Sequence, residues 1–372
     1  MTEVHQLKVP QIDLVRQYKM MKQDIDGAIG QVLESGSFVL GRWVGEIEKS
    51  VAAVCGARYG IAVASGTDAL DIALTACDLK AGDEVITSPF SFVSVPEVAI
   101  RMGARPILVD IDPRTFNTDA AAIAAAITSR TKAIVPVHLY GQSADMDPIL
   151  ETGRKKGIPV IEDMCQAIGA KYKDRPVGSM GAVSCISFYP TKNLGCYGDG
   201  GMLVTNDDVL REKMAALRKH GQGDKYNYKY IGVNSRLDSL QAAILLAKVA
   251  NLPRWNEARR KIASLYDEML KGLPVETPYA APYAYHVYHQ YTIRADRRDQ
   301  LQAHLRERGI GTAIHYPRGI HMQDAYRHLG YKPGDLANCD EAASRVLSLP
   351  MFPELEQAEI EYVAQSIREF YE

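Results

Sequence analysis

Between residues 58 and 205 the chain alternates short apolar runs with segments of helical periodicity, and this alternation limits its possible folds most strongly. Each run is about as long as a strand, rich in Val and Ile, and almost continuously apolar, as at 59–64, 105–110, 158–163 and 201–206. Continuous hydrophobicity predicts strands that are buried on both faces, as in a mostly parallel sheet covered by helices. The alternation therefore predicts an α/β domain whose ligands bind at the carboxyl ends of the strands.

The last third of the chain has a different pattern. A long helical segment, 236–272, is interrupted at Pro253, and a strand-like run, a helix ended by Gly309 and a terminal helix follow it. A chain of 372 residues is also longer than one hydrophobic core usually supports. We therefore expect a large domain at 1–250, which includes the N-terminal arm, and a small α+β domain at 251–372.

The charge and cysteine content exclude several classes of protein. There are 43 basic and 45 acidic residues with no basic block, which argues against nucleic acid and membrane surfaces as partners. No apolar stretch approaches the ~20 residues of a membrane span, and the first residues resemble neither a signal nor a transit peptide. The six cysteines show neither a CxxC pair nor a metal-ligand spacing with His. We expect a cytoplasmic enzyme with reduced thiols and no metal site.

A candidate anion site follows the first apolar run, where Ser65, Gly66 and Thr67 open a helix. The free N–H groups and the positive dipole end of a helix bind phosphate at such a place. The same three residues also suit an ordinary helix cap, so this loop alone decides nothing. The sequence contains neither GxGxxG nor GxxxxGK[ST], which argues against a dinucleotide or ATP site.

Two more polar residues lie where apolar runs end. Asp163 closes the run 158–163, and a buried carboxylate is costly unless a cation meets it. It is either a helix cap or the partner of a positively charged ring nitrogen. Lys192 lies on a turn between a strand that ends near Ser187 and a glycine-rich stretch. A lysine on a turn is usually solvated, but one withheld from solvent has a lowered pKa and attacks carbonyl carbons.

Taken together, these residues predict a cofactor. The phosphate loop, Asp163, Lys192 and the aromatic Phe92 are the parts that hold pyridoxal phosphate (PLP). The cofactor needs a lysine for its aldehyde, a carboxylate for its ring nitrogen, oriented donors for its phosphate and an apolar cover for its ring.

Eight motifs in order along the chain resemble the DegT/DnrJ/EryC1/StrS sugar aminotransferases. They are SGTDAL, VDIDPRTFN, VPVHLYGQSADMDPI, IEDMCQA, SFYPTKNLGCYGDGG, GVNSRLDSLQAA, HYP…H and VLSLPM, and the resemblance extends from about residue 9 to the C-terminus. It implies the fold-type-I (aspartate aminotransferase-like) PLP transferase fold, with a mixed, mostly parallel central sheet, helices on both faces and a smaller C-terminal α+β domain. It also implies a homodimer whose two active sites are shared between subunits.

The resemblance further assigns roles around the cofactor ring. Lys192 would bind the aldehyde carbon and move a proton to and from the substrate carbon. Asp163 would pair with the ring nitrogen, Gln166 would hydrogen-bond the ring hydroxyl, and Phe92 would stack on the ring. Family members usually have two small residues before this glutamine, whereas here positions 164–165 are Met-Cys. That difference adds bulk but removes no catalytic group.

Other residues would bind the phosphate and the substrate. Three residues of the same subunit would hold the phosphate: Gly66, Thr67 and Ser187. Asn234 would reach it from the other subunit. The candidates for contacts to the nucleotide-sugar are Arg236, His315 and Tyr316. Alternatively, Arg236 forms an ion pair with Asp238 at a helix start, and His315 is structural.

We therefore expect a PLP-dependent aminotransferase that transfers an amino group from an amino acid, L-glutamate by analogy, to a nucleotide-diphosphate keto-sugar in amino-sugar biosynthesis. KNLGCYGDGG, HGQ and NSRLD most resemble enzymes that aminate the C3 keto group, on TDP-6-deoxy sugars or UDP-2-acetamido-3-keto-glucuronate. The product would serve a surface polysaccharide or a glycosylated metabolite. A perosamine-synthase-like 4-keto-sugar aminotransferase is the alternative. A PLP-dependent sugar dehydratase and a non-catalytic regulator also stay open, although Lys192 argues against the first.

Overall fold

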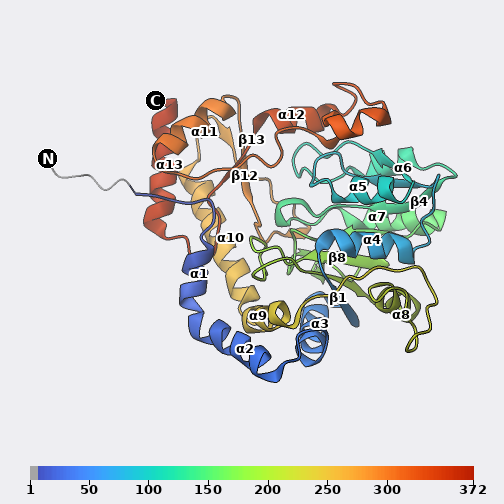
Figure 1. Cartoon of the computed structure of the whole chain (residues 1–372). Helices are drawn as coiled ribbons and strands as arrows, with labels where there is room; N and C mark the ends of the chain where they lie inside the picture. Colours follow the sequence, from blue (N-terminus) through green and yellow to red (C-terminus); the bar gives the residue numbers. More distant parts are fainter. Residues whose placement is uncertain (1–6) are drawn as a thin grey trace.

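The computed structural model describes residues 7–372 and contains one large sheet (Figure 1). Its strands are β1 (Tyr59–Val63), β2 (Glu84–Thr87), β3 (Arg105–Leu108), β4 (Thr131–Val135), β5 (Ile161–Asp163), β8 (Val183–Ser187) and β9 (Gly201–Thr205). They pair as β3-β2-β4 and β5-β8-β9-β1, and parallel bridges join β4 to β5 through the pairs Ile134–Val160 and Val137–Asp163. Strand β9 runs antiparallel to β1 and β8, while β2–β3, β2–β4 and β5–β8 are parallel. The predicted mixed, mostly parallel sheet is confirmed.

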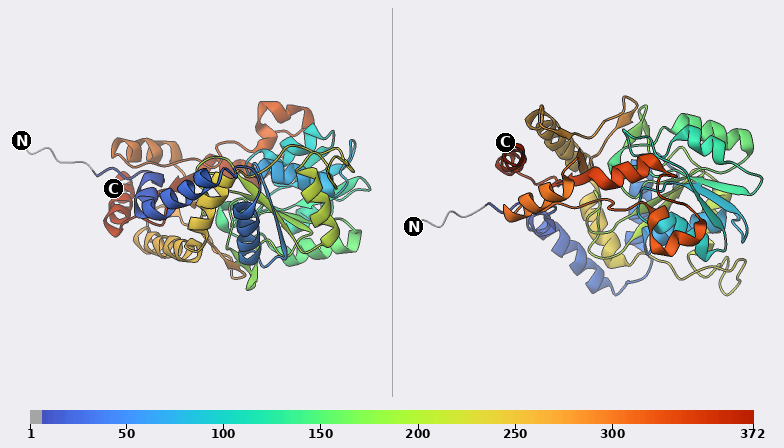
Figure 2. Two further views of the ribbon diagram at one scale, coloured as in Figure 1. Left: turned by 60° about the horizontal axis from the view of Figure 1, so that its bottom comes forward. Right: turned by 90° about the horizontal axis from the view of Figure 1, so that it is seen from above.

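Helices cover both faces of this sheet, as predicted. Successive side chains of a strand point to opposite faces, so a continuously apolar strand presents an apolar surface on each face, and helices bury both. In β1, Ile61 and Val63 belong to the core beneath α4 (Gly66–Ala76), α5 (Ser94–Arg101) and α8 (Asp208–Leu217). Ala62 belongs to the opposite core, which includes α3 (Arg42–Val54) and α9 (Ser239–Val249). Helices α6 (Ala120–Ala126) and α7 (Met146–Lys156) cover the far part of that face. Figure 2 shows the sheet between these layers.

The C-terminal part is built on a second, antiparallel sheet of β10 (Val275–Glu276), β12 (Tyr291–Ala295) and β13 (Val346–Leu349). Its helices are α10 (Leu252–Met269), α11 (Arg298–Glu307), α12 (Ala337–Arg345) and α13 (Gln357–Tyr371). Pro253 lies in the first turn of α10, where proline is tolerated, so the predicted interruption is the break between α9 and α10. The remaining elements are short: β6 (Lys171–Tyr172), β7 (Arg175–Pro176), β11 (Ala284–Tyr285), η1 (Leu139–Gly141), η2 (Ile320–Met322) and η3 (Asp324–Leu329).

The N-terminal arm contacts the C-terminal part. The backbone N–H of Val9 donates to the Gly309 carbonyl at 3.0 Å, and the Gly311 N–H donates to the Val9 carbonyl at 2.7 Å. Helix α1 (Leu14–Met20) follows, and its Arg16 forms an ion pair of 2.8 Å with Glu359 of α13. Helix α2 (Lys22–Ser35) then leads back to the large sheet (Figure 1). The division at residue 250 remains a prediction.

None of the helices within residues 7–372 combines the length and hydrophobicity that crossing a bilayer requires.

Candidate active site

A pocket of about 580 Å³ lies at the carboxyl ends of β1, β5 and β8. Its lining includes these predicted site residues: Gly66, Thr67, Phe92, Asp163, Gln166, Ser187, Lys192, His315 and Tyr316. The first seven lie at the ends of strands of the large sheet or in the segments that directly follow them, and the last two come from the C-terminal part. Ligands of α/β sheets bind at this edge, so the pocket lies where the strand pattern predicts it.

The N-terminus of α4 forms one wall of the pocket. Ser65 caps the helix by accepting a hydrogen bond from the Asp68 N–H at 3.0 Å, and the hydroxyls of Thr67 and Ser94 lie 3.0 Å apart. A Cβ on Gly66 would lie 2.8 Å from the Cβ of Ser187, so only glycine allows the helix to start this close to β8. The first N–H groups of a helix have no partner within it. This wall therefore offers oriented donors that suit a phosphate.

Asp163 is the last residue of β5 and is only 7% exposed. Backbone hydrogen bonds of 2.9 Å join it to Pro136 and His138, and its Oδ1 accepts a hydrogen bond from the Cys165 N–H at 3.1 Å. No helix begins after it, so the helix-cap alternative is wrong. Within residues 7–372 no cationic side chain lies in ion-pair contact with this carboxylate, which therefore fits the protonated nitrogen of a bound ring.

Gln166 presents a hydrogen-bond donor to the same space. Its Oε1 accepts from the Tyr140 N–H at 2.8 Å, so its amide NH₂ is directed the other way, 3.3 Å from the Tyr316 hydroxyl. Burial raises the pKa of Tyr316, which keeps this hydroxyl protonated. Together the amide and the hydroxyl suit the oxygen substituent of a pyridine ring.

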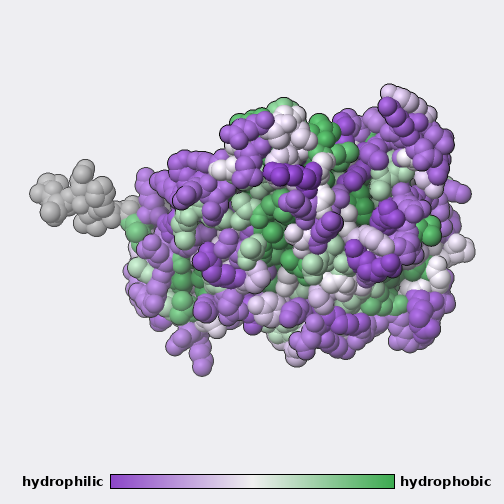
Figure 3. Space-filling model, turned by 90° about the horizontal axis from the view of Figure 1, so that it is seen from below, coloured by the Kyte–Doolittle hydropathy of each residue, from purple (hydrophilic) through white to green (hydrophobic). Residues whose placement is uncertain are grey.

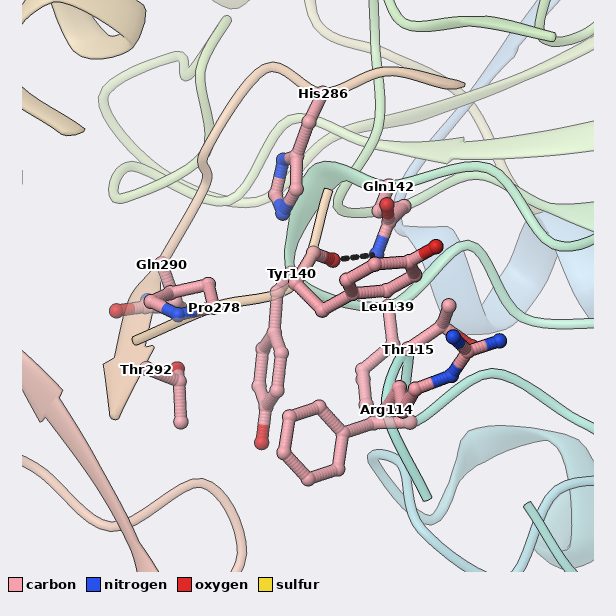
Figure 4. Close-up of a pocket in the computed structure, with 11 residues that line it drawn as sticks. Arg114, Thr115, Leu139, Tyr140, Gln142, Pro278, His286, Gln290 and Thr292 are labelled. Carbon is pink, nitrogen blue, oxygen red and sulfur yellow. Dashed lines mark hydrogen bonds between the residues drawn. The ribbon is translucent and has the colours of Figure 1, made fainter. Parts of the chain in front are cut away.

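Tyr140 supports this arrangement from behind the pocket. Its hydroxyl donates to the His315 carbonyl while its backbone holds Gln166. Behind it lies a small cavity of about 10 Å³ (Figure 4), where Gln142 donates to the Tyr279 carbonyl at 3.0 Å. A volume of this size is about that of one water molecule, so this region is packed rather than open to a ligand.

Lys192 lies on the turn after β8 and is half-buried. Its N–H donates to the Tyr189 carbonyl at 2.9 Å. Burial lowers the pKa of Lys192, and the nearby Cys165 and Asp163 act in the opposite direction. The lowered pKa increases the fraction of neutral amine, which is the form that attacks carbonyl carbons.

Glycines around this turn allow the close approach that the sequence predicts. A Cβ on Gly195 would lie 2.4 Å from the Pro190 carbonyl oxygen, and one on Gly201 would lie 2.3 Å from the Ser65 carbonyl. No side chain fits at either position. The lysine turn is therefore packed directly against the loop that starts α4.

Two predicted residues lie outside the pocket of their own subunit. Asn234 is exposed and pairs through its backbone with Lys219, and Arg236 does not line the pocket. Arg236 forms no ion pair with Asp238 among the described residues, so the helix-start alternative is wrong. Their assigned roles would require a second subunit and remain predictions.

Several lining residues were not predicted from the sequence. They include Tyr189, Thr191, His289 and Gln290, together with Cys165, which was noted only as an unusual neighbour. His289 and Gln290 directly precede β12, and His289 lies 97 residues after Lys192 in the sequence. Their only signal is a pair of polar residues at the entry to an apolar strand, which is too common to indicate a site.

The fold and the pocket define an aminotransferase. The family model described as "DegT/DnrJ/EryC1/StrS aminotransferase family" matches residues 19–368. The chain belongs to this family, as the sequence motifs indicate.

Three similar proteins share almost the full length of the chain. The "Pleiotropic regulatory protein" of Geobacillus stearothermophilus is 49% identical over 98% of this chain and 99% of its own. The UDP-N-acetyl-3-dehydro-alpha-D-glucosamine 3-aminotransferase of Acidithiobacillus ferrooxidans is 44% identical, with 97% of each chain covered. The UDP-2-acetamido-2-deoxy-3-oxo-D-glucuronate aminotransferase of Pseudomonas aeruginosa is 45% identical over 96% of this chain and 98% of its own.

Among solved structures, S. venezuelae DesV in complex with a ketimine intermediate matches with a TM-score of 0.96. It is 40% identical and covers 98% of this chain and 99% of its own. The predicted fold is confirmed.

Proposed function

We propose that the protein is a PLP-dependent aminotransferase that moves an amino group from an amino acid to the C3 keto group of a nucleotide-diphosphate sugar. The observation that supports this best is the combination, in one pocket, of a buried carboxylate that forms no ion pair within residues 7–372, an amine of lowered pKa and a helix start that suits an anion. The carboxylate is Asp163 and the amine is Lys192. No common structural role explains all three features at once.

PLP, when bound, supplies an aldehyde carbon and an electron-withdrawing ring. The start of α4, with Gly66, Thr67 and Ser187, would bind the phosphate. Asp163 would keep the ring nitrogen protonated, because the carboxylate lowers the cost of a buried positive charge. Gln166 would orient the ring through its oxygen substituent.

Lys192 has two tasks in this proposal. Its amine would hold the cofactor, and the freed amine would take and return the proton at the substrate carbon that carries the amino group. The lowered pKa of Lys192 serves both tasks, because each begins with the neutral amine. One pocket that serves an amino acid and a keto-sugar in turn gives ping-pong kinetics. L-Glutamate is the proposed donor.

The names of the similar proteins support the acceptor class. The acceptors of the two named UDP-sugar enzymes share UDP, an N-acetylated or acetamido sugar and a C3 ketone, and they differ at C6. Their identities to this chain are 44% and 45%, which does not separate the two acceptors. We therefore propose a UDP-linked 3-keto amino-sugar precursor as the first acceptor to test. The 4-keto-sugar aminotransferase remains the second candidate.

The dimer belongs to the same proposal. Six apolar side chains are exposed on two segments, 38–39 and 226–233, and we refer to them together as the exposed apolar surface: Phe38, Val39, Tyr226, Tyr228, Ile231 and Val233. Ile231 is 96% exposed and Tyr226 is 77% exposed. A backbone bridge joins Val39 to Asp238, which places part of this surface beside the segment that carries Asn234 and Arg236. Figure 3 shows apolar areas between polar ones on the side of the molecule that carries α2 and α3.

Exposed apolar surface of this kind marks an interface. A second copy packed there would bring Asn234 and Arg236 to the pocket of its partner. A cytoplasmic location is proposed on the six cysteines, all of which are free.

Spectroscopy of the PLP-loaded protein tests the function. Nucleotide sugars that bear an amine at C3 or at C4 are added one at a time, and the absorbance band of the lysine-bound cofactor is followed. Loss of the band with the C3-amino sugar only is expected. Loss of the band with the C4-amino sugar only would mean that the enzyme aminates C4 instead of C3. A wild-type protein that takes up no PLP would be better described as a regulatory protein.

A further inference from the structure

Two buried amides lie beside Lys192 and fix each other's orientation. Asn256 donates from Nδ2 to the Ile168 carbonyl at 3.1 Å, so its Oδ1 is the acceptor for Asn193 at 2.9 Å. Asn193, which follows Lys192 and is 5% exposed, also donates from Nδ2 to the Val287 carbonyl at 3.1 Å. Backbone carbonyls can only accept, so both NH₂ groups are placed without ambiguity. The Oδ1 of Asn193 is left as an acceptor.

That acceptor determines the proton position on His289. The Nδ1 of His289 lies 3.2 Å from Asn193 Oδ1, so Nδ1 must carry the hydrogen. Burial, together with Lys192, Arg259 and His315, holds the pKa of His289 well below its usual value, so the ring is neutral. Its Nε2 therefore has a free lone pair, and the side chain lines the active-site pocket.

The second imidazole of the pocket is not fixed in this way. His315 Nδ1 lies 3.0 Å from the Ser348 hydroxyl, which in turn lies 2.9 Å from the Thr292 hydroxyl. A hydroxyl can donate or accept, so these contacts permit either tautomer of His315. Of the two histidines that line the pocket, only His289 is hydrogen-bonded to an atom that can only accept a hydrogen, the Oδ1 of Asn193.

We propose that His289 is a positioning residue for Lys192: its unprotonated Nε2 accepts a hydrogen bond from the Lys192 amine, directly or through one water. The proposal rests on the proposed function. Lys192 must detach from the cofactor in every cycle and stay aimed at the reacting carbon. The Nε2 of His289 is a fixed acceptor that holds the freed amine without adding a charge. Because the imidazole stays neutral, it orients the Lys192 amine and does not take up its proton.

Matched variants separate this role from a structural one. In His289→Asn, the side-chain NH₂ replaces Nδ1–H and keeps the bond to Asn193, but nothing replaces Nε2. In His289→Gln, a polar group reaches the Nε2 position and the bond to Asn193 is lost. His286→Gln changes a buried imidazole outside the active-site pocket and is the control.

The expected result is that His289→Asn keeps the thermal midpoint of the wild type. Its rate of attachment of Lys192 to added PLP falls about tenfold, the effect of one hydrogen bond. The pH midpoint of the absorbance of the lysine-bound cofactor also moves. His289→Gln recovers part of the rate, and His286→Gln changes neither quantity. An unchanged rate and pH midpoint in His289→Asn would overturn the proposal.

A second measurement does not depend on any variant folding. In ¹⁵N-histidine-labelled wild-type protein, NMR distinguishes protonated from unprotonated ring nitrogens. We expect His289 with a hydrogen on Nδ1 and none on Nε2 from pH 6 to 8, a range around the ordinary histidine pKa of roughly 6.5. A hydrogen on Nε2 overturns the proposal. If the wild type shows no absorbance band of a lysine-bound cofactor, the proposed function fails. The NMR measurement of the His289 tautomer needs no cofactor, so it tests the further inference separately from the proposed function.

Discussion

The strand-end pocket and the segment that carries Asn234 and Arg236 contain residues of one predicted site, yet they differ in almost every physical respect. Asp163 and Gln166 in the pocket are fixed by hydrogen bonds to backbone groups. In the second segment Asn234 is exposed, and Ile231 shortly before it is 96% exposed. The side chains that line the first region all come from one chain, whereas the second would gain a ligand contact only if another copy packed against it.

The largest effect is expected for Lys192→Ala. Removing the amine eliminates both the attachment point and the proton acceptor, so the rate of amino transfer falls roughly 10³-fold or more. The half-reaction with each amino substrate, followed by absorbance, measures this. The exposed Lys19→Ala is the control for a lost charge. Turnover near the wild-type rate would contradict the role of the pocket lysine.

Asp163→Asn tests the carboxylate with little change in shape. An amide cannot balance a positive ring nitrogen, so kcat is expected to fall by about 10²-fold, the usual effect of losing one preorganised electrostatic contact. Asp163→Glu keeps the charge and should retain more activity. Stopped-flow absorbance and kcat for both variants check this, and equal losses would mean that packing, not charge, matters here.

A subunit-mixing experiment tests the comparison between the two regions directly. Lys192→Ala and Asn234→Ala are each expected to be impaired alone. After unfolding and refolding together, half of the dimers are mixed and each has one intact site, so about a quarter of wild-type activity returns. The recovered activity is compared with that of the same two variants mixed without unfolding. No recovery would mean that Asn234 does not complete the active site of a partner subunit.

The smallest effect concerns stability at low pH. Burial lowers the pKa of His286 to about 3 and that of His315 to about 4, from an ordinary value of 6.5. Below pH 6.5 the unfolded chain binds protons on these rings and the folded chain does not, so stability falls with falling pH down to about 4 for His315 and about 3 for His286.

Each ring contributes at most about 1.4 kcal/mol per pH unit to the free energy of unfolding. Urea unfolding at several pH values measures the slope. His286→Gln should reduce it, and the exposed His328→Gln should not. A slope unchanged by His286→Gln would mean that this ring is protonated in the folded state.

The sequence predicts the pocket well because its central residues follow strands. Asp163 and Ser187 end two apolar runs, and neighbouring parallel strands bring such ends to one edge. His289 could not be predicted in the same way. It reaches the pocket through a contact with Asn193, 96 residues away, and no local pattern encodes that distance. The surroundings of Asn234 and Arg236 depend on a second chain, which a single sequence does not describe.

The N-terminal arm has a consequence for the order in which the protein can be completed during synthesis. Arg16 leaves the ribosome well before its partner Glu359, which lies 343 residues later in the chain. The arm therefore stays unpaired until the segment around Glu359 has emerged. A fragment that ends near residue 250 would lack Gly309, Gly311 and Glu359, which are the residues that the arm contacts. Such a fragment should therefore be expressed without its first helix.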